Sequence, residues 1–167
     1  TVTYAIRIFN EGEVLAKASK VVDYLPEGVS FKKAYLQLEE GSEKLELSAT
    51  EQTSIPGTVE YVEDSKMVKF TYSGNLLNSF DPEQDTLDYY TFYIECEVEP
   101  EAKGILTNVT EITEYEWAGN RMVTTDIDST SGNWDILPLD KTDGASRLDE
   151  EWIDYSNSRD LPDEIED

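Results

Sequence analysis

The residues of this chain most able to do chemistry are the acidic side chains of its C-terminal third. Residues 126–167 hold 14 Asp and Glu against three basic residues, so the segment carries a net charge of −11. Carboxylates packed this densely repel one another unless a cation lies among them. The cation that suits them best is Ca²⁺, because it takes six to eight oxygens from carboxylates, amides and backbone carbonyls.

Oxygen donors recur at near-alternate positions from residue 126 onward, as they do at the start of a calcium loop. An EF-hand counted from Asp126 would need Gly at its sixth position and an acid at its twelfth. The chain has Ser131 and Leu137 there, so this is not an EF-hand. Further ligands would have to come from later acidic clusters. The predicted calcium ligands are Asp126, Asp128, Ser129, Asn133, Asp149, Glu150, Glu151 and Asp154.

The alternative to a metal site is a solvated acidic tail, because segments with high net charge and low hydrophobicity do not bury enough apolar surface to fold. Here the acids are interleaved with apolar residues that favour folding, among them Trp134, Ile136 and Trp152. We therefore expect an acidic extension over residues 126–167 that Ca²⁺ stabilises, with the solvated tail as the competing hypothesis.

Composition argues against several classes of protein. The chain of 167 residues has a net charge of −24, which disfavours contact with nucleic acid and anionic membranes and favours cations and basic partners. Its apolar runs are too short for a spanning helix, so no direct membrane insertion is expected. Histidine is absent, and the sequence has no phosphate loop or nucleophile elbow. We expect no catalytic activity.

The single cysteine and two other features have structural explanations. One cysteine excludes an intramolecular disulfide and a thiolate zinc cluster. Cys96 lies on the apolar face of a strand-like run, where we expect a small buried hydrophobe. Asn108-Val-Thr110 fits the glycosylation sequon, but a polar strand residue bonded to neighbouring backbone is the more frequent case. The three tryptophans could form a sugar-stacking platform, yet their spread over loops favours small hydrophobic clusters.

Short alternating runs separated by turn residues predict an all-β fold. In residues 89–98 every even-numbered position is apolar, which is the period of a half-buried antiparallel strand. Similar runs cover residues 1–9, 15–24, 59–62, 67–72, 105–112 and 122–125. We expect an immunoglobulin-like antiparallel β-sandwich over residues 1–125. Its predicted core includes Ile6, Ile8, Phe31, Phe92, Ile94 and Cys96.

Three stretches together resemble a known family. They read VTYAIRIFNEG over residues 2–12, VDYLPEGVSF over residues 22–31 and LTNVTEI over residues 106–112. They are similar to the bacterial conserved-repeat domain of surface proteins, the eleventh domain of unknown function. Its pattern is a Tyr-rich first strand ending in Asn-x-Gly, then Asp-x-Leu-Pro-x-Gly-x-x-Phe, then Leu-Thr-Asn. Residues 126–133 resemble the Firmicutes versions. Residues 32–89 are longer and more polar than a typical repeat, so we expect an insertion there.

The resemblance implies a stalk or adhesin module at the extracellular bacterial cell surface, whose partners are neighbouring repeat domains of the same polypeptide or fibre. One alternative is a module that binds a protein or glycan ligand through residues 32–89. Another is a self-assembling fibre subunit, in which an edge strand or the C-terminal extension completes a neighbour's sheet. Some surface sandwiches also carry a Lys–Asn isopeptide crosslink, for which Lys17 or Lys20 with Asn108 would be the conceivable pair.

Overall fold

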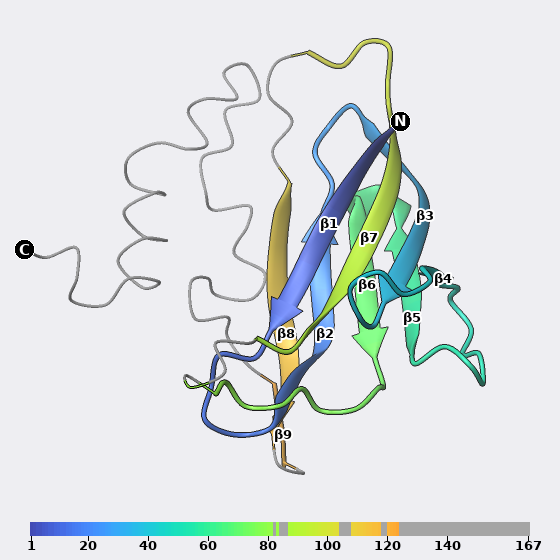
Figure 1. Ribbon diagram of the computed structural model, residues 1–167. Coiled ribbons are helices and arrows are strands. Elements are labelled where there is room, and N and C mark those ends of the chain that lie inside the picture. Colours follow the sequence, from blue (N-terminus) through green and yellow to red (C-terminus); the bar gives the residue numbers. More distant parts are fainter. Residues whose placement is uncertain (82, 84–86, 104–107, 118–119, 124–167) are drawn as a thin grey trace, which may run out of the picture.

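The computed structural model describes residues 1–123 except 82, 84–86, 104–107 and 118–119. These residues form two antiparallel sheets that lie face to face (Figure 1). The only helical element among them is a single 3₁₀ turn over Glu63–Ser65. No helix in this part of the chain is long and apolar enough to cross a membrane. The expected all-β architecture of two antiparallel sheets is therefore confirmed.

The first sheet has four strands in the order β1-β7-β3-β4. The strand β1 spans Val2–Phe9 and pairs along its whole length with β7, Tyr89–Val98. On the other side of β7 lies β3, Val29–Gln37, with one irregularity in register between Phe31 and Lys33. The outermost strand β4, Leu45–Glu46, has only two residues.

The second sheet has five strands in the order β5-β6-β2-β8-β9. Its bounds are β5 Gly57–Val62, β6 Met67–Tyr72, β2 Ala16–Tyr24, β8 Val109–Trp117 and β9 Asn120–Val123. The central strand β2 pairs with β6 on one side and β8 on the other. The strand expected over residues 105–112 thus lies over 109–117, and the predicted hairpin across residues 63–66 is confirmed.

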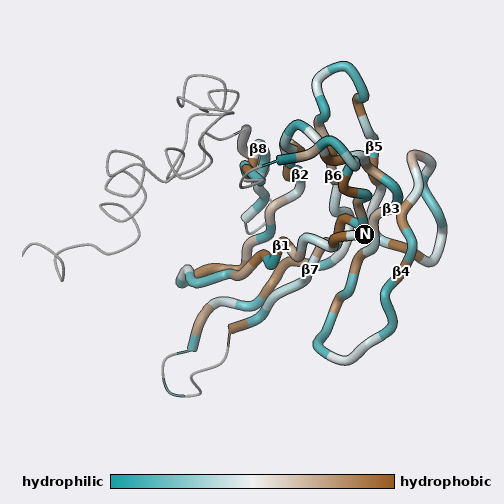
Figure 2. The backbone as a smooth tube through the Cα atoms, turned by 90° about the horizontal axis from the view of Figure 1, so that it is seen from above, coloured by the Kyte–Doolittle hydropathy of each residue, from teal (hydrophilic) through white to brown (hydrophobic). Residues whose placement is uncertain are grey.

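Aromatic rings from the two sheets meet in the core. Phe70 of β6 stacks on Phe92 of β7 at a centroid distance of 4.2 Å, and Tyr72 stacks on Tyr90 at 3.9 Å. Buried apolar residues from both sheets form one core cluster. Figure 2 shows the backbone from above, coloured by the hydropathy of each residue. Four predicted core residues are buried, namely Ile8, Phe92, Ile94 and Cys96. Ile6 and Phe31 are partly buried and pack against this core.

The strand order differs from that of an immunoglobulin constant domain at both terminal strands. Such a domain pairs its first strand with its second, and its last strand with its sixth. Here β2-β6-β5 and β3-β7 follow that order, but β1 pairs with β7 and β8 pairs with β2. The first and last long strands have therefore exchanged sheets. The immunoglobulin-like assignment stays a prediction, and the C-terminal extension lies outside the described residues.

Turn residues behave as their chemistry dictates. Gly28 has φ +81°, and a side chain there would have its Cβ 2.7 Å from the Cβ of Ala102. Glycine therefore fits both the backbone conformation and the space at the end of the Pro26-Glu-Gly28 turn. Residues 32–89 supply β4, β5, β6 and most of β3. An insertion relative to other repeats stays a prediction, because it is a statement about relatives.

The core stack generates the first prediction. Phe92 is completely buried against Phe70, so Phe92→Ala should lower the free energy of unfolding by about 3–5 kcal/mol. The matched control is Phe9→Ala at a ring that is 43% exposed, which should cost about 1 kcal/mol. Urea unfolding followed by tryptophan fluorescence measures both. Equal losses in the two variants would contradict this core.

Candidate functional site

The predicted calcium ligands, residues 126–154, all lie outside the described residues. The calcium site therefore stays a prediction. Within the described part of the chain, no group of three or more His, Cys, Asp or Glu side chains is arranged to hold a metal ion. Trp134 and Trp152 lie outside it too, while Trp117 ends β8 and is 39% exposed.

The described residues instead contain a buried carboxylate between the two sheets. Asp23 lies near the end of β2 opposite Thr110 of β8, and its side chain is completely inaccessible to solvent. Its Oδ2 accepts a hydrogen bond from Asn108 Nδ2 at 2.5 Å and another from Thr110 Oγ1 at 2.6 Å. Asp23 shares the inward face of β2 with the core residue Val21 because side chains alternate along a strand.

Two buried oxygens of this cluster have no hydrogen-bond partner among the described residues. They are Asp23 Oδ1 and Asn108 Oδ1. A buried acceptor without a partner costs on the order of 1–3 kcal/mol, and more when it is charged. Only one of the two carboxyl oxygens of Asp23 therefore has hydrogen-bond partners. The cost favours a protonated carboxyl, which can donate a hydrogen bond from its second oxygen.

The environment shifts the ionisation of Asp23 toward neutrality. Burial raises the pKa of its carboxyl from the ordinary 3.8 to about 6, against the opposing effect of the hydrogen bonds from Thr110 and Asn108. The same low-polarity surroundings raise the pKa of the Cys96 thiol to about 12, with the Asp23 charge as a second cause. Cys96 is completely buried and is expected to be an unreactive thiol, as the sequence predicts.

Two more buried carboxylates lie where β2 pairs with β8, the strand pair that Asp23 also joins. We call this strand pair and its buried polar residues the β2–β8 seam. Tyr24 donates a hydrogen bond to Glu111 Oε2 at 2.8 Å, and Ser19 donates to Glu114 Oε1 at 2.9 Å. Both glutamates are at most 5% exposed. The register of the strand pair shifts on both sides of Lys20, and Ser19 falls within this irregularity. A β-bulge of this kind re-aims side chains, and here the buried Ser19 hydroxyl meets Glu114.

The contacts of this seam bear on two hypotheses from the sequence, the glycosylation sequon at Asn108 and the Lys–Asn isopeptide crosslink. The Asn108 amide and the Thr110 hydroxyl both bind Asp23, so the sequon residues are engaged in the fold, through a side chain rather than through backbone. Lys17 pairs with Glu116 at the far end of β8 and donates to the carbonyl of Gly74 at 2.7 Å. Lys20 lies beside Glu114 at 3.6 Å. Neither lysine is placed to form an isopeptide bond with Asn108.

A second buried polar residue, Asn10, connects a turn and a loop by hydrogen bonds at the other end of the sandwich. The side-chain amide of Asn10, which is 7% exposed, donates to the carbonyls of Val14 at 2.8 Å and Leu77 at 3.1 Å. Its Oδ1 accepts from the backbone N–H of Gly12 at 3.1 Å. This amide fixes the turn after β1 against the loop that follows β6. Asn10 therefore has a structural role in the Asn-x-Gly stretch.

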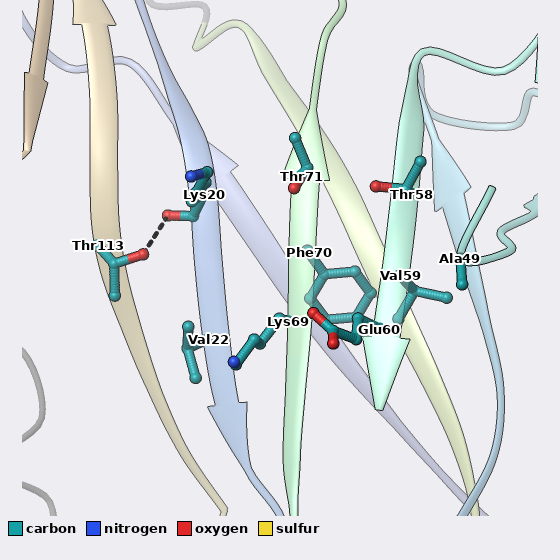
Figure 3. A pocket seen from close by; sticks show the side chains of 10 residues that line it. All are labelled: Lys20, Val22, Ala49, Thr58, Val59, Glu60, Lys69, Phe70, Thr71 and Thr113. Carbon is teal, nitrogen blue, oxygen red and sulfur yellow. Dashed lines mark hydrogen bonds between the residues drawn. The ribbon is translucent and has the colours of Figure 1, made fainter. Parts of the chain in front are cut away.

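The outer face of the five-stranded sheet carries a hollow of about 620 Å³ (Figure 3). Its polar groups include the ammonium groups of Lys20 and Lys69, the Glu60 carboxylate and three threonine hydroxyls. Such groups could bind a small polar ligand or an extended peptide. The lining residues are Lys20, Val22, Ala49, Thr58, Val59, Glu60, Lys69, Phe70, Thr71 and Thr113.

Asp23 is a site residue that was not predicted from the sequence. A signal was present, because a charged side chain interrupts the apolar face that Val21 begins on β2. Chemically the cluster can stabilise and specify the pairing of β2 with β8, and it can take up a proton. It cannot contact a substrate in this conformation because Asp23 is enclosed.

Comparisons with known proteins leave the family open. No family model, curated protein or solved structure matches this chain.

The raised pKa of Asp23 generates the second prediction. Native Asp23 binds its proton more tightly than the unfolded chain does, so its contribution to stability is complete below pH 4 and is lost as pH rises through 6. From pH 7 to pH 5 the protein should gain roughly 1 kcal/mol from this group. Asp23→Asn should remove that gain, as measured by urea unfolding at each pH.

The control for that experiment is Asp64→Asn, which makes the same change in net charge at an exposed site. Acidification also relieves repulsion among the other carboxylates, so the informative quantity is the difference in slope between the two variants. If both variants keep the wild-type dependence on pH, Asp23 is not the responsible group.

Proposed function

We propose that this chain is a non-catalytic structural or adhesive module of the bacterial cell surface. The observation that carries the proposal is the contact between Asp23 and Asn108. These residues stand in two of the three stretches that resemble the conserved-repeat domain, and they are 85 positions apart in sequence. Motifs that meet inside the fold as a structural lock support that resemblance and a structural role.

The third stretch supports the same interpretation. Asn10 of the Asn-x-Gly element uses its side chain to hold a turn against a distant loop. In each stretch the polar motif residue is therefore engaged in holding strands or turns together. A family whose motif residues build the scaffold suits a spacer or display module better than an enzyme, because catalytic residues must reach a substrate.

The first and last long strands run between opposite ends of the sandwich (Figure 1). The strand β1 begins at the upper end of the sandwich in Figure 1, and β8 runs to the opposite end, where β9 begins. The strand registers show the same arrangement. Val2 at the start of β1 lies opposite Cys96 near the end of β7, and Ala16 at the start of β2 lies opposite Trp117 at the end of β8. Under this proposal the domain is a variant of the immunoglobulin-like sandwich with exchanged terminal strands.

Surface display can be tested on the bacterium that produces this protein. Antibodies against residues 1–123 should label intact cells, and protease added outside should remove the label while a cytoplasmic marker stays protected. Labelling that appears only after lysis would contradict a surface location.

The proposal includes Ca²⁺ bound by Asp126, Asp128 and later acids of the extension. Ca²⁺ should raise the melting temperature and the protease resistance of residues 126–167 relative to chelator, because a ligand at 100 times its dissociation constant adds about 2.7 kcal/mol. Mg²⁺ at equal ionic strength is the control for screening of exposed charges. Equal effects of Ca²⁺ and Mg²⁺ would leave the acids as a solvated tail.

The hollow favours one alternative, a module that binds a protein or glycan ligand. Most of its lining residues come from β5 and β6, within residues 32–89, the stretch from which the sequence predicts recognition. A glycan array and a pull-down with Lys69→Ala as the binding-defective variant would separate this function from a purely structural one. Loss of a captured ligand in the variant would favour recognition.

A further inference from the structure

We propose that the free edge of β1 is a self-association surface, which pairs antiparallel with β1 of a second copy of this chain. The inference rests on the sheet order and not on the proposed function. Within the described residues β1 pairs with β7 alone, so one side of an eight-residue strand faces no neighbouring strand. An edge of this kind is a template for another strand.

The backbone register shows which groups lie at the free edge. The N–H of Asn10 donates to the carbonyl of Asp88, and this pair continues the β1–β7 register. In an antiparallel pair the residues that exchange hydrogen bonds alternate with those whose N–H and C=O point away. Even-numbered residues of β1 therefore bond to β7. The groups that point away belong to Thr3, Ala5, Arg7 and Phe9.

The composition of β1 offers little protection for this edge. Natural edges are usually blunted by proline, lysine, a bulge or short length. The strand reads VTYAIRIF, has no proline or lysine, and pairs with β7 without a register shift. All four residues with outward-pointing backbone groups are exposed. Its only charged side chain is Arg7, which lies over the Tyr89 ring at 4.9 Å on the outer face.

The other sheet edges in the described part of the chain are shorter or covered. The strand β4 has two residues and β9 has four. The strand β5 has six, but the outward N–H of Gly57 donates to Ile55 and that of Val59 donates to Ser48. Within the described part of the chain, the edge of β1 is thus the longest one whose outward backbone groups form no hydrogen bond to another described residue.

A second copy of β1 fits this edge in one symmetric register. If Ala5 lies opposite Ala5 on a two-fold axis, residue 3 lies opposite residue 7 and residue 1 opposite residue 9. Odd positions then face odd positions, so free N–H groups meet free carbonyls. Large outer side chains lie opposite small ones, as Arg7 does opposite Thr3. The half-buried residues Tyr4 and Ile6 pair across the axis, which would extend both cores.

Charge determines the strength of this dimer. Each chain carries −24, so two copies repel one another at low ionic strength. The repulsion is long-range, whereas backbone hydrogen bonds are short-range, so salt should strengthen the pairing as the screening length falls from about 30 Å at 0.01 M to about 8 Å at 0.15 M. One strand pair is smaller than the interface of a stable complex, so we expect a weak dimer.

The test is sedimentation equilibrium of the whole chain over a wide range of concentration at low and high NaCl. The mass should rise from 19.0 kDa toward twice that value, and the dissociation constant should fall with salt. Ala5→Pro should weaken the dimer at least about tenfold, because it removes the two central N–H donors and no bond to β7. Ala5→Ser is the matched control and should dimerise like wild type.

Opposite charges at position 5 test the register itself. Ala5→Lys and Ala5→Glu should each remain monomeric, because like charges would lie directly opposite one another. A mixture of the two should form a heterodimer. A wild-type chain that stays monomeric at high salt would overturn the proposal, as would a dimer that survives Ala5→Pro. Failure of the charged variants to complement each other would overturn the register even if Ala5→Pro proved to be misfolded.

Discussion

The pairing of β2 with β8 around a buried carboxylate is the constraint on which the rest of this structure depends. Asp23 lies between two sheets where water does not reach it, so its hydrogen bonds must come from the protein. Asn108 and Thr110 supply two of them, both to Oδ2; Thr110 lies at the start of β8 and Asn108 directly precedes that strand. Moving β8 by one residue along β2 would point these donors to the outer face and leave the carboxylate unsolvated.

This seam has consequences for both terminal strands. Because β8 occupies the side of β2 opposite β6, that side is closed to β1. The first strand instead lies beside β7, at the edge of the other sheet. One buried polar cluster thus accounts for the exchange of strands relative to the immunoglobulin order and for the long free edge of β1. In the dimer that we propose, β1 of a second copy pairs with this edge.

Buried carboxylates are the second feature that shapes this structure. Three carboxylates between β2 and β8 are buried and accept hydrogen bonds from hydroxyl and amide groups, and one of them also lies beside an ammonium group. Stacked aromatic rings across the two layers supply apolar burial that such polar contacts do not. A buried ion costs more in desolvation than its contacts usually return. The seam therefore specifies strand order more than it adds stability.

The sequence by itself determined the all-β class and the approximate position of most strands. Period-2 alternation over 89–98 and the turn at Pro26-Glu-Gly28 are local properties, set by the pleat of a strand and by the φ values these residues allow. Cys96 could be placed in the core because it shares a face with Phe92 and Ile94. Net charge, the absence of histidine and the acidic cluster over 126–167 are likewise properties of the sequence alone.

Only the tertiary structure decided which strands are neighbours and which polar residues are buried. Asp23 and Asn108 are 85 positions apart, and no local signal states that they touch. The same pattern of strands could have placed β1 beside β2, because alternation fixes which face of a strand is buried but not its partner. Strand order follows from satisfying buried polar groups across distant segments, and those contacts exist only in the folded chain.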